Sequence, residues 1–357
     1  MKLLVTGVEG YIGCLLAPYL EARGHEVVGY DTGYYRDGWL FSDSRLVPGF
    51  PRTVNRDIRQ IKAADLQGVD AVVHLAELSN DPLGENDPEL TFEINHRGSV
   101  RLAELAREGG VKRFVYTSSC SVYGLAECTD TMTERSRVNP LTAYAKCKAL
   151  VERDVGAMDG ANFSPTFLRN ATAYGASPRM RFDIVLNNLC GIAATTGRIA
   201  MTSDGTPWRP LVHVLDICEA IACVLEAPRD AVHGEVFNVG HEADNYQVRE
   251  IAQIVGDVYP GCELSFGPDS ADNRSYRVSF AKIHESLPGF RCSWDARRGA
   301  RQLHQVFSRI ALDAAGFEAR PFTRLKQLKY LIGSARWIRA CSGRAERSLA
   351  ETRIVRW

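Results

Sequence analysis

Short apolar runs alternate with longer segments of helical periodicity through the first third of the chain. In the helical segments, residues 11–23 and 87–109, apolar residues recur every three or four positions. Around them stand apolar runs of strand length, at residues 2–6, 26–31, 53–57, 70–76 and 112–119. Strands that alternate with helices in this way favour an α/β fold with a parallel, doubly wound sheet.

Three glycines mark the first turn from strand to helix. Gly7, Gly10 and Gly13 follow the first strand at three-residue spacing. A dinucleotide diphosphate needs a bare backbone at such a turn, at the positive end of the helix dipole. Asp31 ends the second strand, where a carboxylate accepts hydrogen bonds from an adenosine ribose and repels a 2′-phosphate. The pattern predicts a Rossmann-type fold that binds NAD rather than NADP, and an ordinary glycine turn is the simpler alternative.

A serine, a tyrosine and a lysine form the predicted catalytic group. Ser119 ends an apolar strand, at the edge where open α/β sheets bind ligands. Tyr144 and Lys148 stand four residues apart on a segment of helical character, so both face the same way. A neighbouring ammonium lowers the pKa of a tyrosine, which is about 10 in the free side chain. The three groups suit proton transfer coupled to hydride transfer, although such a tyrosine–lysine pair alone is more often a surface pair.

The order of these motifs resembles the extended short-chain dehydrogenase/reductase family. The resemblance covers residues 1–290 and rests on TGxxGxxG, Asp31, Asp57-Ile58, HLA, Asn95, SSCSVYG and Tyr144-x-x-x-Lys148. More narrowly, the chain is similar to the NAD-dependent epimerase/dehydratase group, which acts on nucleotide-linked sugars. The predicted NAD contacts are Gly7, Gly10, Tyr11, Ile12, Gly13, Asp31, Asp57, Ile58, Leu75, Ala76 and Lys148. For Asp57, a cap at the end of a strand is an equal alternative.

The resemblance also implies two domains. Residues 1–175 would form the NAD-binding domain, with residues 211–240 returning to it, and a smaller α/β domain, mainly residues 176–290, would bind the sugar nucleotide. Three segments resemble those that bind the nucleotide diphosphate in the family, and they point to Asn188, Arg209 and Arg274. Guanidinium groups suit diphosphate oxygens. A surface charge or a structural ion pair is the alternative for each arginine.

Several positions depart from the pattern of the family. Cys120 and Ser121 stand where dehydratases of the group carry an Asp-Glu pair, so dehydration is not expected. Cys120 and Thr172 remain candidate substrate contacts, with a small core thiol as the alternative for Cys120. Glu77 replaces a small residue near the expected nicotinamide. Its carboxylate would contact a sugar hydroxyl or point to solvent.

Composition and charge narrow the range of partners. The 357 residues are 45% hydrophobic and carry a formal net charge of zero, so nucleic acid and membranes are not expected as partners. Ten cysteines without a Cys-x-x-Cys pair favour reduced thiols over disulfides or a metal site. Because no leader or bilayer-spanning run is visible, we expect a soluble, cytoplasmic protein. His74 and His213 lie in apolar strand patterns and are interpreted as core histidines.

The C-terminal residues 291–357 form a basic extension with 15 Lys+Arg and 5 Asp+Glu. Leu325, Leu328, Leu331 and Ile332 give it an apolar stripe of helical spacing. The stripe could pack on the body of the protein, which we prefer, or form a subunit contact, or rest on an acidic surface. Homodimers are common in the family, but no interface can be identified from the residues.

The function expected from these motifs is NAD-dependent epimerisation of a nucleotide-diphosphate sugar, at C4 through a transient 4-keto sugar. Ser119, Tyr144, Lys148 and NAD suffice for this reaction. The main alternative is an NAD(P)H-dependent reductase or dehydrogenase of a nucleotide 4-keto sugar. A non-catalytic NAD-sensing protein is a remote alternative, because such proteins typically lose the tyrosine or the lysine.

Overall fold

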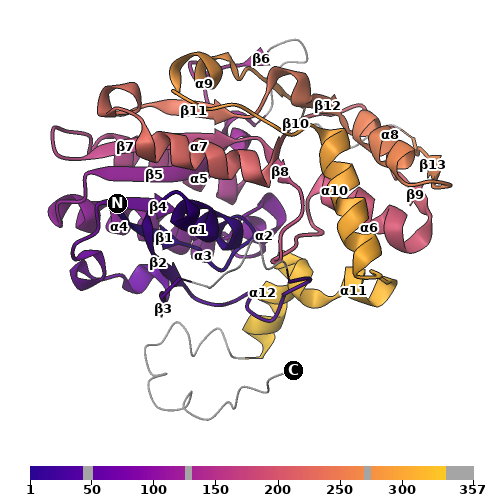
Figure 1. The fold of residues 1–357 in the computed structure, drawn as a ribbon, viewed down its shortest axis with the longest axis horizontal. Coiled ribbons are helices and arrows are strands. Elements are labelled where there is room, and N and C mark those ends of the chain that lie inside the picture. The colour runs from indigo at the N-terminus through magenta and orange to yellow at the C-terminus, as the bar shows by residue number, and fades with distance from the viewer. Residues whose placement is uncertain (43–50, 125–130, 269–274, 335–357) are drawn as a thin grey trace.

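A parallel sheet of seven strands forms the centre of the molecule (Figure 1). The computed structural model describes residues 1–42, 51–124, 131–268 and 275–334. The strands lie in the order β11 (Val236–Val239), β7 (Ser164–Asn170), β5 (Arg113–Ser119), β4 (Ala71–His74), β1 (Lys2–Thr6), β2 (Glu26–Asp31) and β3 (Thr53–Asn55). Since β1 lies inside the sheet and the chain winds outward on both sides of it, the predicted doubly wound α/β fold is confirmed.

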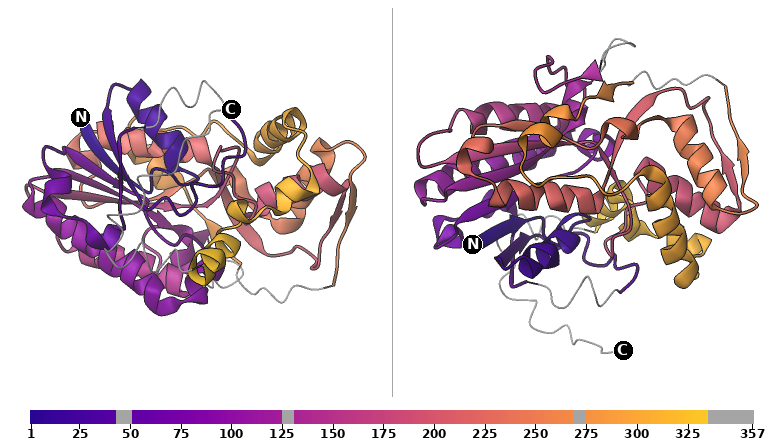
Figure 2. Two further views of the ribbon diagram at one scale, coloured as in Figure 1. Left: turned by 90° about the horizontal axis from the view of Figure 1, so that it is seen from below. Right: turned by 45° about the horizontal axis from the view of Figure 1, so that its top comes forward.

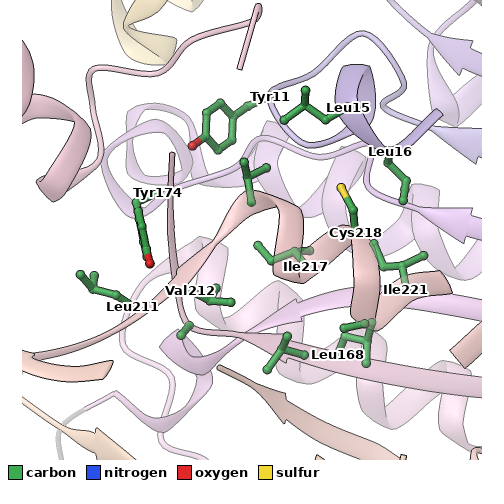
Figure 3. Close-up of a cluster of buried hydrophobic side chains, with 14 of the residues drawn as sticks. Tyr11, Leu15, Leu16, Leu168, Tyr174, Leu211, Val212, Ile217, Cys218 and Ile221 are labelled. Atoms are coloured by element: carbon green, nitrogen blue, oxygen red, sulfur yellow. The ribbon is translucent and has the colours of Figure 1, made fainter. Parts of the chain in front are cut away.

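Alternating side chains of the strands pack into two separate hydrophobic cores, one on each face of the sheet. In β1, Leu3 and Val5 join the core beneath α1 (Gly13–Ala22) and α7 (Val214–Glu226), whereas Leu4 joins the core beneath α4 (Gly98–Glu108) and α5 (Ala143–Gly156). This follows from the two-residue period of a strand, with both faces of a parallel sheet buried. Figure 3 shows side chains of α1 and α7 in the first core, among them Leu16 and Cys218.

The predicted long helix at residues 87–109 is interrupted in the structure. It consists of α3 (Pro88–Thr91), a π-helical stretch (Phe92–Arg97) and α4. Within the π-helical stretch, the Asn95 side chain accepts a hydrogen bond from the backbone N–H of Leu78 at 2.8 Å and donates one to its carbonyl at 3.0 Å. Asn95 thereby fixes the segment that leaves β4, which continues into α2 (Asp81–Asn86).

The second half of the chain builds a smaller α/β unit beside the sheet (Figure 2). Its three-stranded sheet has the order β12 (Asn245–Gln247), β10 (Trp208–His213) and β8 (Thr172–Tyr174). The chain leaves this unit through α7 and returns to the central sheet at β11. The remaining elements are β6 (Thr131–Met132), α6 (Val185–Thr196), β9 (Arg198–Ala200), α8 (Val248–Val258), β13 (Glu263–Ser265), β14 (Arg277–Val278), α9 (Ala281–Ser286), α10 (Ala296–Arg309) and α11 (Ala314–Glu318).

The described end of the chain folds back onto the first half. Helix α12 (Arg324–Gly333) contacts α2 (Figure 1). Leu328 and Leu331 are buried in the core of the first half, Leu325 is partly buried against it, and Ile332 is exposed. Most of the apolar stripe therefore packs on the body of the protein. Within the part of the chain that the structure describes, no helix is long and apolar enough to span a membrane.

Candidate active site

A cavity of about 360 Å³ opens at the carboxyl ends of the central strands, between the two units. Most of the residues predicted from the sequence line it, although they come from distant parts of the chain. They are Gly7, Gly10, Tyr11, Ile12, Gly13, Asp31, Asp57, Ile58, Leu75, Ala76, Ser119, Tyr144, Lys148, Thr172 and Arg209. This position agrees with the rule that open α/β sheets bind ligands at the carboxyl ends of their strands.

The glycine turn leaves no room for side chains. Gly7 has a φ of +72°, and a Cβ there would lie 2.9 Å from the backbone nitrogen of Ala76. A Cβ on Gly13 would lie 2.2 Å from the carbonyl oxygen of Gly7. The bare turn and the first turn of α1 form one wall of the cavity. Such a wall fits the diphosphate of a dinucleotide, which approaches the backbone closely.

Asp31 lies at the ribose end of this wall. Its carboxylate accepts hydrogen bonds from the backbone N–H groups of Glu9 at 3.0 Å and Gly33 at 2.8 Å. Arg36, a nearby cation, pairs with Glu9 at 2.5 Å. A carboxylate beside an arginine that is already paired fits a ribose with free hydroxyls better than one with a 2′-phosphate. These residues therefore fit NAD.

The carboxylate of Asp57 has a local structural task. It caps the short helical turn that begins at Ile58, accepting the backbone N–H of Arg59 at 2.9 Å. The Arg59 guanidinium also donates to it at 2.8 Å and 3.0 Å. Asp57 and Ile58 still line the cavity, so their backbone remains available to a ligand while the carboxylate acts as the strand-end cap.

Two elements bring the three predicted catalytic side chains together. Ser119 stands at the end of β5, and Thr142 caps α5 by accepting the N–H of Ala145 at 3.2 Å, which places Tyr144 in its first turn. Ser119 and Tyr144 line the same cavity, and Ser119 lowers the pKa of the Tyr144 phenol. The ammonium of Lys148 lies 5.5 Å from the centre of the Tyr144 ring, and Lys148 as a residue is only 4% exposed. The three side chains thus converge on one wall of the cavity.

Glu77 also joins this group. Its carboxylate lies 2.5 Å from the ammonium of Lys148 and accepts a hydrogen bond from the hydroxyl of Tyr116. Lys148 donates in addition to the backbone carbonyl of Thr117. Burial raises the pKa of Glu77, and Lys148 opposes that rise. Since the Glu77 side chain is 2% exposed, it does not point to bulk solvent.

The ion pair changes the electrostatics of Tyr144. Burial raises the pKa of Tyr144, and the charges of Glu77 and Asp81 raise it further, while the hydrogen bond with Ser119 and the charge of Arg181 lower it. The expectation that Lys148 sets a lowered pKa is therefore wrong for this arrangement. Glu77 offsets the charge of the lysine, and burial disfavours the phenolate.

The predicted substrate contacts divide into two groups. Arg209 and Thr172 line the cavity. Asn188 and Cys120 do not: the Asn188 amide donates to the carbonyl of Phe182 at 2.9 Å, and the buried Cys120 thiol donates to the carbonyl of Arg169 at 3.2 Å. Their side chains hold the local fold. Arg274 lies outside the described residues.

The two histidines have core environments. His74 is bonded to Thr6 at 2.6 Å and to Ser99 at 2.7 Å. His213 stacks on Trp294 with 4.0 Å between ring centres and is bonded to Gln302 at 2.9 Å. Burial lowers the pKa of both imidazoles. Neither faces the cavity, in keeping with the interpretation made from their apolar surroundings.

Sequence reasoning missed three arginines that line the cavity, Arg56, Arg181 and Arg324. Arg181 lies seven residues before Asn188, in a segment whose polar residues give no periodic signal. Arg324 begins α12, in the extension beyond the recognised motifs. A tertiary contact brings this residue to the cavity, so no local pattern could have indicated it.

Comparison with known proteins agrees with this geometry. The model of the NAD dependent epimerase/dehydratase family matches residues 3–240. UDP-glucose 4-epimerase of Mycolicibacterium smegmatis is 31% identical over 307 residues, which cover 80% of this chain and 92% of that protein. UDP-glucuronic acid decarboxylase 1 of Arabidopsis thaliana is 28% identical over 319 residues, 85% of this chain and 68% of that protein.

Solved structures share the fold over most of the chain. The structure of MoeE5 in complex with UDP-glucose and NAD is 27% identical, has a TM-score of 0.74, and covers 87% of this chain and all of that one. The family match, the relatives and the cavity lined by the predicted cofactor and catalytic residues agree with one another. This chain belongs to the NAD-dependent epimerase/dehydratase family.

Proposed function

We propose that this protein is an NAD-dependent C4 epimerase of a nucleotide-linked sugar. The observation that carries the proposal is that Ser119, Tyr144 and Lys148 converge on the cavity, while the two positions after Ser119 carry no acid–base pair. Cys120, at the first of the two acidic positions of dehydratases, is buried and faces away from the cavity. Ser121, at the second, lines the cavity but has no acid–base function near neutral pH.

The residues that would hold NAD are the glycine turn, Asp31 and Lys148. When bound, NAD supplies a hydride acceptor that can return the hydride to the other face of the sugar. The glycine turn carries no side chains that would block the diphosphate, and the Asp31 carboxylate would accept hydrogen bonds from the ribose hydroxyls. Lys148 donates to the carbonyl of Thr117, so its ammonium is held at a fixed place beside Tyr144.

Tyr144 is the proposed acid and base. Its phenolate would take the proton of the C4 hydroxyl and become the phenol, which would later give the proton back, and Ser119 would hold the same sugar oxygen through a hydrogen bond. Because burial and Glu77 raise the pKa of Tyr144, the phenol is protonated at neutral pH in the arrangement described here. A ligand that draws the Glu77 carboxylate away from Lys148 would make Tyr144 a stronger acid and the phenolate easier to form.

Relatives indicate which substrates to try first. The epimerase from Mycolicibacterium smegmatis is a UDP-glucose 4-epimerase, and MoeE5 was solved with UDP-glucose. We therefore propose a UDP-hexose, with Arg209 as one contact for its diphosphate. Other nucleotides and sugars fit the same chemistry.

The test is to incubate the purified full-length protein with UDP-glucose or UDP-galactose, without added cofactor, and to separate the products by chromatography. Conversion of each sugar nucleotide into the other, with protein-bound NAD released on denaturation, is the expected result. Net accumulation of NADH with an oxidised sugar would identify a dehydrogenase instead. A product lighter by one water would show a dehydratase and would refute the epimerase proposal.

A further inference from the structure

Two buried arginines meet in the wall of the cavity, and they come from different parts of the fold. Arg181 follows β8 and is 9% exposed, while Arg324 begins α12 and is 3% exposed. The guanidinium of Arg324 lies 4.0 Å from the centre of the Tyr35 ring, which also lines the cavity. A segment near the described end of the chain therefore forms part of the ligand site.

The two guanidinium groups are incompletely neutralised. Asp183 accepts a hydrogen bond from Arg181 Nε at 2.8 Å and another from the backbone N–H of Arg324 at 3.2 Å. Within the described part of the chain, the guanidinium of Arg324 donates only to backbone carbonyls, those of Pro321 at 3.2 Å and Arg179 at 3.4 Å. One carboxylate thus faces two buried positive charges. A buried charge without full compensation is costly, and an anionic ligand would offset that cost.

One donor of the pair has no partner. Among the described residues, nothing accepts a hydrogen bond from Nη2 of Arg181, although this atom is buried. The other two nitrogens of this guanidinium donate to Asp183 and, at 3.3 Å, to the hydroxyl of Ser79. Because Arg181 lines the cavity, the remaining donor is available to a ligand.

The charges of the two arginines act on residues at the glycine turn and at the start of α1. The charges of Arg181 and Arg324 both lower the pKa of Tyr11, and that of Arg324 also lowers the pKa of Cys14 in the first turn of α1, although burial outweighs them and raises both values. Arg181 acts on Tyr144 as well. Both arginines line the same cavity as the glycine turn, the first turn of α1 and Tyr144.

We propose that Arg181 and Arg324 bind the diphosphate of a ligand, so that α12 completes the binding site. Guanidinium groups bind phosphate oxygens in pairs, and two of them beside a helix N-terminus match a diphosphate with two negative charges. Both NAD and a nucleotide sugar carry this group. Arg324 lies 4.0 Å from the Tyr35 ring, and the cavity is also lined by Tyr11 of the glycine turn, which favours NAD. The inference rests on the proposed function and adds a binding element from outside the segment 3–240 that matches the family.

The experiment measures ligand affinity of the full-length protein by calorimetry. The variants are Arg324→Gln and Arg181→Gln, with Arg320→Gln as the control, because Arg320 pairs with Asp37 at the surface and does not line the cavity. The ligands are NAD, ADP-ribose, UDP-glucose and UDP, with adenosine as the ligand that lacks phosphate. We expect affinity for ligands with a diphosphate to fall about tenfold or more in the two test variants, and affinity for adenosine to stay unchanged.

The pattern of losses identifies the source of the diphosphate. A loss for NAD and ADP-ribose alone assigns the pair to the cofactor, and a loss for UDP-glucose and UDP alone assigns it to the substrate. Equal affinities in Arg324→Gln, Arg320→Gln and the unaltered protein overturn the inference while leaving the proposed function intact. An unaltered protein that binds neither NAD nor a sugar nucleotide overturns the proposed function itself.

Two further measurements distinguish a structural role of Arg324 from a role in ligand binding. Arg324→Lys keeps the charge but not the paired hydrogen bonds, and we expect it to bind diphosphate ligands with an affinity between those of the glutamine variant and the unaltered protein. If Arg324→Gln does not fold, Arg181→Gln carries the test, since it leaves α12 unchanged. If a folded Arg181→Gln variant then binds diphosphate ligands as well as the unaltered protein does, the proposal that the two arginines bind the diphosphate is refuted.

Discussion

At the scale of single residues, the proposed chemistry depends on a phenol that the fold holds in its neutral form. Tyr144 is half-buried in the wall of the cavity, where burial and the charge of Glu77 raise its pKa and Ser119 lowers it. Replacing it by phenylalanine removes the acid and base but preserves the ring. We expect Tyr144→Phe to lower turnover about 10²- to 10⁴-fold, while the amount of NAD bound per chain stays the same. Turnover is measured with the sugar nucleotide, and bound NAD after denaturation; unchanged turnover would remove Tyr144 from the mechanism.

The charge of Glu77 leads to a prediction about how kcat/KM depends on pH. Its negative charge raises the pKa of Tyr144 and offsets Lys148, so its removal lowers that pKa. The phenolate is then available at lower pH. In Glu77→Gln the acidic limb of the profile of kcat/KM against pH is expected to move down by about one pH unit.

The matched control for this prediction is Glu93→Gln. Glu93 pairs with Arg97 on the surface of the helix and does not line the cavity, so its profile should coincide with that of the unaltered protein. An acidic limb that stays in place or moves to higher pH in Glu77→Gln would show that Glu77 does not control the protonation of Tyr144.

At the scale of elements, the glycine turn is the most constrained local structure of the site. A Cβ on Gly13 would lie 2.2 Å from the carbonyl oxygen of Gly7, where neither backbone segment can yield easily. Gly13→Ala should destabilise the protein by about 1–3 kcal/mol and reduce bound NAD. Gly160→Ala is the control, because a Cβ there meets nothing within 4 Å, and it should change stability by less than about 0.5 kcal/mol. Equal melting temperatures of the two variants would contradict the crowding argument.

The elements differ in how far the sequence could predict them. The first strand, the turn, the first helix and the second strand follow from local period and glycine spacing, and their bounds lie close to those of β1, α1 and β2. The interruption of the helix at residues 92–97 has no periodic signal, since it depends on the contact of Asn95 with Leu78. Such contacts also decide whether a polar side chain points into the cavity or bonds to the protein itself. Asn188 is an example, because its amide donates to the carbonyl of Phe182.

The residues of the site also divide into those that the sequence could place and those that it could not. The residues on strand ends and on α5 could be placed from sequence, because the carboxyl edge of a parallel sheet gathers them. The pairing of Glu77 with Lys148 and the position of Arg324 could not, since each joins segments far apart in the chain. Long-range packing thus sets the electrostatics of a site whose location the sequence motifs already indicate.

At the scale of the whole molecule, α12 links the end of the described chain to the first half. Leu328 is 1% exposed and packs into the core beneath α4 and α5. Leu328→Ala should cost about 2–5 kcal/mol of stability and should weaken NAD binding as well, because α12 carries Arg324. Both effects are measured by calorimetry on the full chain.

Ile332→Ala provides the comparison on the same helix. Its side chain is 40% exposed, so the loss of stability should stay below about 0.5 kcal/mol, with unchanged NAD affinity. A destabilised Leu328→Ala that binds NAD as well as Ile332→Ala does would separate the packing of α12 from ligand binding.

The return of α12 to the cavity has a consequence for synthesis on the ribosome. The seven strands of the central sheet are complete at residue 239, but Arg324 emerges 85 residues later. At a synthesis rate of about 5–20 residues per second, the nascent chain spends several seconds with its sheet available and its cavity wall unfinished. A chain released before α12 would therefore be expected to assemble the sheet yet lack one of the two arginines, and translation must pass this helix before the proposed site is complete.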